Sequence, residues 1–188
     1  MKASDNLRKL HEITEGVHPE AYLCPAGVLT IGIGHTEQKK HPFTKDSKWT
    51  EEQITAAWRD DVAWAEAEAN TRLTRDVSQG IFDAVTDLIF NCGTGCRTFL
   101  THVNNNNKEQ AEDALLMWIN ASGKAQLGLI KRRFADLALM RGDPDWARFV
   151  TCPATSKNYK ALKDMIAEMG WALEPDALKN FALRRIEG

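Results

Sequence analysis

The sequence predicts an α+β protein that is mostly helical, with a small α/β lobe at the N-terminus and a helical lobe after it. A β-rich run with interleaved glycines occupies residues 21–36. A strong helix start follows at Thr50, and apolar residues recur at helical spacing over most of the chain after it. A length of 188 residues suits one domain or two small lobes.

Composition and charge favour a soluble globular protein. Hydrophobic residues make up 43% of the chain and charged residues 27%. The formal net charge of −2 argues against general nucleic-acid binding, which requires a basic surface. No stretch approaches the roughly 18 apolar residues that span a membrane, and the charged N-terminus lacks the apolar core of a secretion signal. We therefore expect a protein that is made and folded in the cytoplasm.

The N-terminal lobe is predicted to combine one helix with one β-hairpin. A helix over residues 3–15 carries an apolar stripe and ends before Gly16, a good stop signal. Residues 21–36 then form two short strands joined by a Pro-Ala-Gly turn. The segment from His41 to Lys48 is polar and predicts a loop.

The helix predicted over residues 50–73 has the clearest start in the chain. Thr50 as N-cap and Gln53 at the third helical position make a capping box. At a rise of about 1.5 Å per residue this helix would be about 30 Å long, which is enough to connect two lobes.

After this helix the chain is predicted to be helical throughout. Further helices are expected over residues 78–91, 108–121, 125–140, 157–169 and 175–186. The expected organisation is one domain over residues 1–188, made of an N-terminal lobe (1–49), a connecting helix (50–73), a helical lobe (74–140) and a helical extension (141–188).

Four cysteines, at positions 24, 92, 96 and 152, do not make a disulfide scaffold in a chain of this length. Cys92 and Cys96 flank Gly-Thr-Gly, but this spacing misses the usual zinc patterns. We expect buried free thiols, no metal site and no cofactor.

Three side chains near the hairpin suit the chemistry of sugar hydrolysis. Glu15 ends the first helix, Cys24 ends the first strand and Thr30 lies on the second strand. A helix end that faces a hairpin forms a natural cleft. Glycoside hydrolysis needs a carboxylic acid that protonates the leaving oxygen, and a second group that activates water or attacks the sugar. The alternative is that Glu15 is a surface residue, as glutamates at helix C-termini usually are.

The pattern Glu-x8-Cys-x5-Thr followed by IGIGHT resembles the phage-type lysozymes, also called T4-type endolysins, of glycoside hydrolase family 24. The family motif is Glu, eight residues, Asp or sometimes Cys, five residues, and Thr. The run AYLCPAGVLTIGIGHT resembles the family hairpin almost residue for residue. Three more segments resemble the interlobe helix, the core helix with its N-x-G-x-G break and the GLxxRRxxE segment: WTEEQITAAWRDDV, FDAVTDLIFNCGTGCRTFL and GLIKRRFADLAL. Together they cover roughly residues 5–140.

The resemblance implies a lysozyme-like fold and a muramidase, which cleaves the β-1,4 bond between N-acetylmuramic acid and N-acetylglucosamine in peptidoglycan. It implies that Glu15 is the general acid, that Thr30 helps to place the water and that Cys24 takes the position of the second catalytic residue. It also implies that four residues face the glycan: Gly34 and Thr36 on the hairpin edge, and Phe90 and Asn91 before the glycine break.

Cys24 departs from the commoner Asp, and its role stays open. A thiol is mostly neutral at pH 7 unless its pKa falls from about 8.5. A thiolate would activate water or attack the anomeric carbon, a neutral thiol would only position water, and the remaining alternative is a small apolar strand residue. Oxidation, or pairing with Cys152, would silence the site; equal activity with and without reductant would contradict this hypothesis.

His35 is predicted to be structural and tied to a carboxylate of the other lobe, with Asp83 or Asp87 as its partner; a catalytic role is the alternative. Three consecutive basic residues are expected to hold Glu15 or meet the peptide stem, with one of them touching the cleft: Lys131, Arg132 and Arg133. The Glu of GLxxRRxxE is Asp136 here.

We thus predict a monomeric phage or prophage endolysin that is released from the host cytoplasm by a holin and acts on peptidoglycan in the periplasm. With Glu15 as acid and water on the opposite face, it would invert the anomeric centre. Its pI of about 6.2 predicts weak long-range attraction to an anionic wall. The extension 141–188 is expected to pack as extra helices or to bind the wall or a partner. A virion-associated or toxin-type muramidase, a lytic transglycosylase and a non-catalytic peptidoglycan-binding protein are the alternatives.

Overall fold

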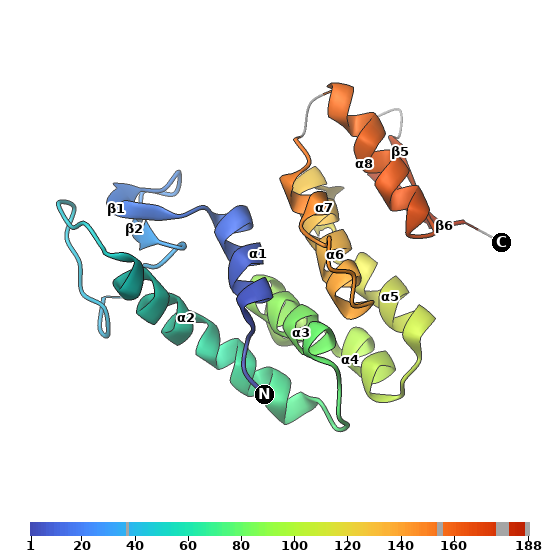
Figure 1. The fold of residues 1–188 in the computed structure, drawn as a ribbon, viewed down its shortest axis with the longest axis horizontal. Helices are drawn as coiled ribbons and strands as arrows, with labels where there is room; N and C mark the ends of the chain where they lie inside the picture. Colours follow the sequence, from blue (N-terminus) through green and yellow to red (C-terminus); the bar gives the residue numbers. More distant parts are fainter. Residues whose placement is uncertain (37, 154–155, 176–180, 187–188) are drawn as a thin grey trace.

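The structure is a computed structural model that describes residues 1–36, 38–153, 156–175 and 181–186 (Figure 1). It begins with α1 (Asp5–Glu15), followed by an antiparallel hairpin of β1 (His18–Leu23) and β2 (Leu29–Gly32). The Ser4 side chain caps α1 by accepting a hydrogen bond from the Asn6 backbone, and Gly16 ends the helix with a φ of 82°. A helix and a hairpin are the elements that the sequence predicts for this lobe.

The helix α2 (Glu51–Arg72) runs from the hairpin toward the helical lobe (Figure 1). Its predicted capping box is present: Thr50 Oγ1 accepts from the Gln53 backbone at 3.4 Å, and Gln53 Oε1 accepts from the Thr50 backbone at 2.9 Å. The buried side of α2 packs against β2 and the next helix, so it joins the two lobes as expected.

The helical lobe has two central helices, α3 (Gln79–Cys92) and α6 (Leu127–Met140), which pack against each other and are mostly buried. Around them lie the shorter elements of the lobe: η1 (Gly93–Gly95), α4 (Arg97–Asn104), α5 (Lys108–Leu116), β3 (Asn120–Ala121), β4 (Lys124–Ala125) and α7 (Arg148–Thr151). The helix predicted over 108–121 is therefore too long. Ser122 and Gly123 have φ values of 52° and 75°, which close a two-residue turn between β3 and β4.

The C-terminal extension contains α8 (Ser156–Glu168) and an antiparallel hairpin of β5 (Trp171–Pro175) and β6 (Phe181–Arg185) at the end of the molecule away from β1 and β2 (Figure 1). The predicted helix over 175–186 is wrong in its described part. Gly170 breaks the helix with a φ of 89°, and burial then alternates along β5, since Trp171 and Leu173 are buried. Residues 176–180 of that prediction lie outside the described residues.

No helix in the described part of the chain is both long and apolar enough to cross a membrane.

The close approach of α3 to α6 gives a test of the core packing. A Cβ atom on Gly80 would overlap the carbonyl oxygen of Leu139 and lie 2.8 Å from its carbonyl carbon. Alanine favours a helix over glycine by about 1 kcal/mol, but overpacking against a backbone costs about 1–3 kcal/mol. Gly80→Ala is therefore expected to lower the free energy of unfolding, measured in urea.

Gly128→Ala in α6 is the matched control. A Cβ atom there has no described atom within 4 Å, so this variant should be as stable as wild type or up to about 1 kcal/mol more stable. Equal stability of the two variants would contradict the close α3–α6 contact.

Candidate active site

Glu15 is the last residue of α1 and faces the end of the first hairpin. Gly34 follows β2 with a φ of 71°, and a Cβ atom built on it would lie 3.8 Å from Cβ of Glu15. The Glu15 side chain is 34% exposed. Its Oε1 accepts a 2.7 Å hydrogen bond from Nη1 of Arg132 on α6. Of the three consecutive basic residues, Arg132 is the one that holds the acid.

Arg132 is itself held by Asp87, a fully buried residue of α3. Its Nε lies 3.0 Å from Oδ2 of Asp87 and its Nη2 lies 2.8 Å from Oδ1. Arg133 adds a 2.9 Å hydrogen bond from Nη2 to Oδ2, and His11 Nε2 lies 2.9 Å from Oδ1. Asp87 therefore links α1, α3 and α6 in the core next to Glu15.

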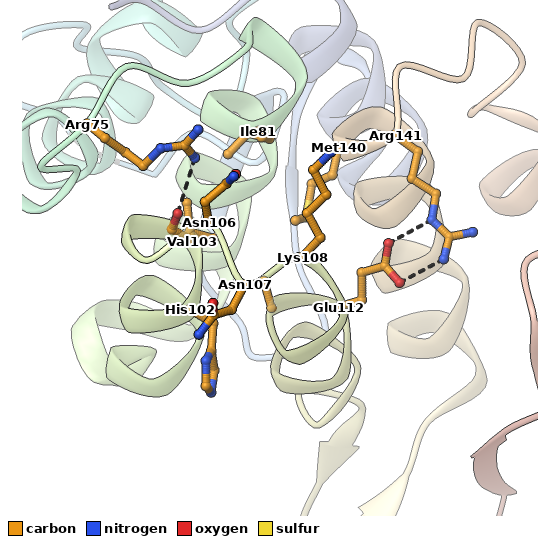
Figure 2. Close-up of a pocket in the computed structure, with 11 residues that line it drawn as sticks. Arg75, Ile81, His102, Val103, Asn106, Asn107, Lys108, Glu112, Met140 and Arg141 are labelled. Carbon is orange, nitrogen blue, oxygen red and sulfur yellow. Dashed lines mark hydrogen bonds and ion pairs between the residues drawn. The ribbon is translucent and has the colours of Figure 1, made fainter.

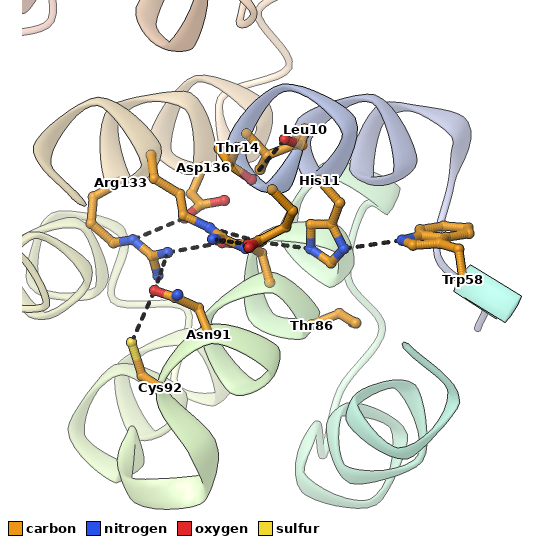
Figure 3. Close-up of polar contacts among 12 residues, drawn as sticks. Leu10, His11, Thr14, Trp58, Thr86, Asn91, Cys92, Arg133 and Asp136 are labelled. Carbon is orange, nitrogen blue, oxygen red and sulfur yellow. Dashed lines mark hydrogen bonds and ion pairs between the residues drawn. The ribbon is translucent and has the colours of Figure 1, made fainter. Parts of the chain in front are cut away.

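The tautomer of His11 follows from its other neighbour. Trp58 on α2 donates from Nε1 to Nδ1 of His11 at 3.1 Å (Figure 3). Because Nδ1 accepts, the proton of a neutral His11 is on Nε2, which donates to Asp87. His11 was not among the predicted site residues. The sequence feature that could have indicated its role is the position of a polar residue beside Leu10, on the apolar stripe of the first helix.

The pKa values of the two buried carboxyls in the cluster shift in opposite directions. Burial alone would raise the pKa of Asp87, but the charge of Arg132, the hydrogen bond of His11 and the charge of Arg133 hold it well below its usual range. Burial and the charge of Asp87 raise the pKa of Asp136 well above its usual range. Neither oxygen of Asp136 accepts a hydrogen bond from any residue that the structure describes, and Arg133 Nε lies 3.3 Å from its Oδ2.

A cleft of about 460 Å³ opens beside Glu15. It is lined by Thr14 and Glu15 of α1, Asn91 of α3 and Arg132 of α6, among others. Asn91 Oδ1 accepts from Nη2 of Arg133 at 3.2 Å, as Figure 3 shows. The structure thus brings Glu15 and Asn91 to one cleft through adjacent arginines.

Cys24 lies at a tight turn between β1 and β2. Its backbone N–H donates to Val28 at 2.9 Å, and Gly27, with a φ of 76°, donates back to the Cys24 carbonyl at 2.7 Å. Backbone hydrogen bonds from Val28 and Ala26 lower the pKa of the Cys24 thiol. Desolvation opposes them, and weaker hydrogen bonds from the Thr30 hydroxyl and Gly27 lower the pKa further. The register of the hairpin pairs Tyr22 with Thr30 and so places Cys24 near Thr30, but neither residue is in the described lining of the cleft beside Glu15.

Cys96 is buried, whereas Cys24, Cys92 and Cys152 are half-buried, so the prediction of buried thiols is correct for Cys96 alone.

His35 differs from the prediction in its partner. Its Nδ1 lies 2.8 Å from Oδ2 of Asp61 on α2, whereas Asp87 binds His11 and Asp83 accepts from Ser4 Oγ at 2.5 Å. The reason is that β2 packs on α2, which places the residue after the strand beside a carboxylate of that helix.

The remaining predicted glycan-facing residues lie on two parts of the chain: Gly34 and Thr36 follow β2, and Phe90 lies on α3. Thr36 and Gly34 are exposed, and the half-buried ring of Phe90 stacks on His11, with centroids 4.5 Å apart and an angle of 30°.

A second hollow, of about 280 Å³, lies at the ends of α3, α4, α5 and α6 (Figure 2). The acidic residue in its described lining is Glu112, and Arg141 donates two hydrogen bonds of 2.8 Å and 2.7 Å to the Glu112 carboxylate. A carboxylate that is already paired twice does not suit acid catalysis, so the cleft at Glu15 is the candidate site.

Comparisons with known proteins identify a family and relatives that are similar to this chain. The family model described as phage lysozyme matches residues 12–136. An endolysin of Acyrthosiphon pisum secondary endosymbiont phage 1 is 34% identical over 132 residues, which is 66% of this chain and 88% of that protein.

Two solved structures share the fold. An endolysin from Escherichia coli O157:H7 phage FAHEc1 superposes with a TM-score of 0.67 and 28% identity over 74% of this chain and 93% of its own. A P22 lysozyme mutant gives a TM-score of 0.67 and 29% identity over 75% of this chain and 99% of its own.

Asp87→Asn is expected to lower the free energy of unfolding at pH 7 by about 3–5 kcal/mol, because it removes the main partner of two buried arginines. The pKa of Asp87 is lower in the folded chain than in the unfolded chain. Its stabilisation is therefore present above the unfolded value of about 3.9 and is lost as the pH falls through the folded value. Urea unfolding from pH 7 downward should show this acid loss in wild type and not in the variant.

Asp136→Asn is the matched control in the same cluster. The pKa of Asp136 is raised on folding, so wild type loses stability as the pH rises from about 3.9 toward the folded value. Asparagine cannot ionise, and this variant should be at least as stable as wild type at pH 7. Equal destabilisation by both substitutions would contradict the assignment of Asp87 as the charged partner.

Proposed function

The chain belongs to the phage lysozyme family, and from that premise we propose how its cleft cuts peptidoglycan. It is a lysozyme-type endolysin, a glycoside hydrolase that cleaves the β-1,4 bond between N-acetylmuramic acid and N-acetylglucosamine. The observation that carries the mechanism is the position of Glu15, at the cleft, with one carboxyl oxygen bound by Arg132.

Glu15 is the general acid that protonates the glycosidic oxygen. Arg132 orients this carboxyl but brings it little net positive charge, since the same guanidinium also binds both oxygens of Asp87. A glycan seated in the cleft would exclude water from Glu15. Removal of water favours the protonated form of a carboxyl, which is the form that an acid catalyst needs.

Cys24 and Thr30 deliver the water to the opposite face of the sugar. The turn donates backbone hydrogen bonds to Cys24, and the lowered pKa of the thiol increases the fraction of thiolate, which can act as the base. The Thr30 hydroxyl, which lies 3.0 Å from the Val28 carbonyl oxygen, stands beside it. Attack by water opposite the acid inverts the anomeric centre.

The glycan strand contacts the rim of the cleft at Gly34, Thr36, Phe90 and Asn91. His35, Arg132 and Arg133 are structural in this scheme, because each is bound by a carboxylate that fixes the neighbouring substrate-facing residues.

The extension is part of the same domain. Arg141 at the end of α6 donates to the Met169 carbonyl at 3.1 Å, and Arg185 of β6 donates to Asp113 of α5 at 2.6 Å. Trp171 and Leu173 are buried against the lobe. These contacts support packing of the described part of the extension on the helical lobe.

The protein acts as a monomer, since a cleft that takes a polymer must open to admit it. A holin releases it from the host cytoplasm to the wall.

Glu15→Gln is expected to lower the rate of peptidoglycan cleavage by about 10²- to 10⁴-fold, the usual contribution of a general acid. Mass spectrometry of fragments from purified Gram-negative peptidoglycan should show reducing N-acetylmuramic acid ends with wild type, and these should vanish with the variant. Anhydro ends would instead indicate a transglycosylase, and the absence of fragments from reduced wild type would indicate binding without cleavage.

Cys24→Ser is expected to lower the same rate at least about tenfold, because a serine hydroxyl does not ionise near neutral pH. Cys24→Asp, which introduces the commoner residue of the family, is the matched control and should remain active. Wild-type activity should rise with pH through the lowered pKa of the thiol, and Cys24→Asp should lack this rise near neutral pH. Full activity of Cys24→Ser would show that the thiol only positions the water and does not act as a base.

A further inference from the structure

Trp64 on α2 presents an unusually exposed aromatic surface. It is 45% exposed, although large aromatic side chains are mostly covered in folded proteins. Its ring is nearly parallel to that of Phe90, with centroids 6.5 Å apart and an angle of 27°. Phe90 itself stacks on the buried His11. Trp64 is thus supported by a packed ring while much of its own surface stays open.

Trp64 forms one wall of a pocket of about 430 Å³, within the range of roughly 300–1,000 Å³ that is usual for ligand sites. Asp60 and Asp61 of α2 and His41 of the loop after β2 also line it. His41 Nε2 lies 2.8 Å from Oδ2 of Asp60. This contact orients the exposed Asp60 carboxylate in the lining of the pocket. The pocket therefore combines a flat apolar wall with fixed polar groups.

Two segments of the chain connect this pocket with the cleft of Glu15. On the hairpin side, His35 lines the pocket and directly follows Gly34, which lies against Glu15. On the helical side, the Phe90 ring that supports Trp64 is followed by Asn91, which lines the cleft. These two connections are the route by which a strand bound at Glu15 would reach the pocket.

The charges in the pocket favour an uncharged sugar. Lys39 and Lys40 balance Asp60 and Asp61, so the lining carries no net charge when the histidines are neutral. The peptide attached to N-acetylmuramic acid carries carboxylates, whereas N-acetylglucosamine carries none. The C–H face of a pyranose ring is apolar and packs on an indole, and its hydroxyl and acetamide groups hydrogen-bond to carboxylates and imidazoles.

We propose that the pocket of Trp64, Asp60 and His41 is a distal subsite for an N-acetylglucosamine residue of the glycan strand, with Trp64 as the stacking platform. The proposal rests on the proposed function, because it takes its ligand from the substrate of the cleft. It adds a pocket whose charges distinguish the two alternating units of the strand, and Trp64 provides the surface on which the sugar stacks.

The test compares wild type with Trp64→Ala and Trp64→Phe on purified Gram-negative peptidoglycan. Cosedimentation with intact sacculi in the cold measures binding, and digestion of soluble strands measures kcat and KM. Trp64→Ala should raise both the Kd for sacculi and KM by about three- to tenfold with little change in kcat, as expected for lost ground-state binding. Trp64→Phe keeps an aromatic face and should retain most of the affinity.

A β-1,4-linked N-acetylglucosamine tetramer added as competitor should displace wild type from sacculi more effectively than it displaces Trp64→Ala. Thermal unfolding of each variant separates lost binding from lost folding. Unchanged Kd and KM in folded Trp64→Ala would overturn the subsite, as would an equal competition by the tetramer in both proteins. Because binding needs no catalysis, a wild type that binds through Trp64 but releases no fragments would contradict the proposed hydrolysis and leave the subsite standing.

Discussion

The structure depends on one buried carboxylate. Asp87 on α3 binds His11 of α1 and the two arginines of α6, Arg132 and Arg133, and so fixes the first helix against the helical lobe. His11 and Glu15 are four residues apart and therefore lie on one face of α1. The same contact that anchors the helix thus aims its last residue into the cleft. A buried ion cluster of this kind contributes more to geometry than to net stability, since desolvation offsets much of the attraction.

The charge balance of the cluster explains why it tolerates a second buried acid. The raised pKa of Asp136 favours its neutral form, so Asp87 is the buried carboxylate that both arginines bind. Each guanidinium then reaches outward after it has bound Asp87: Arg132 to Glu15, and Arg133 to the amide of Asn91. The polar groups that line the cleft are therefore held by side chains of the core. A substitution in the core is expected to alter the position of the Glu15 carboxyl group.

The sequence predicted the elements that local chemistry determines. The capping box at Thr50 identified α2, and the strand residues around a Pro-Ala-Gly turn identified the first hairpin, with Cys24 and Thr30 close together. Contacts between distant segments were not predictable in this way. The partner of His35 is Asp61 because β2 packs on α2, and no local pattern distinguishes Asp61 from other buried or half-buried acids. The second long hairpin was missed because its residues also suit a helix, and the alternation that identifies β5 becomes visible only with the burial of Trp171 and Leu173.

The two proposed catalytic groups are held by different means. Glu15 depends on side-chain charges of the core, whereas Cys24 depends on backbone N–H groups of an exposed turn. Backbone donors that stabilise a thiolate stabilise a carboxylate equally well, because both are anions that accept hydrogen bonds. The turn is therefore compatible with either Cys or Asp at this position without any change in the core. A change between Cys and Asp at position 24 would therefore leave the buried network that holds Glu15 unchanged.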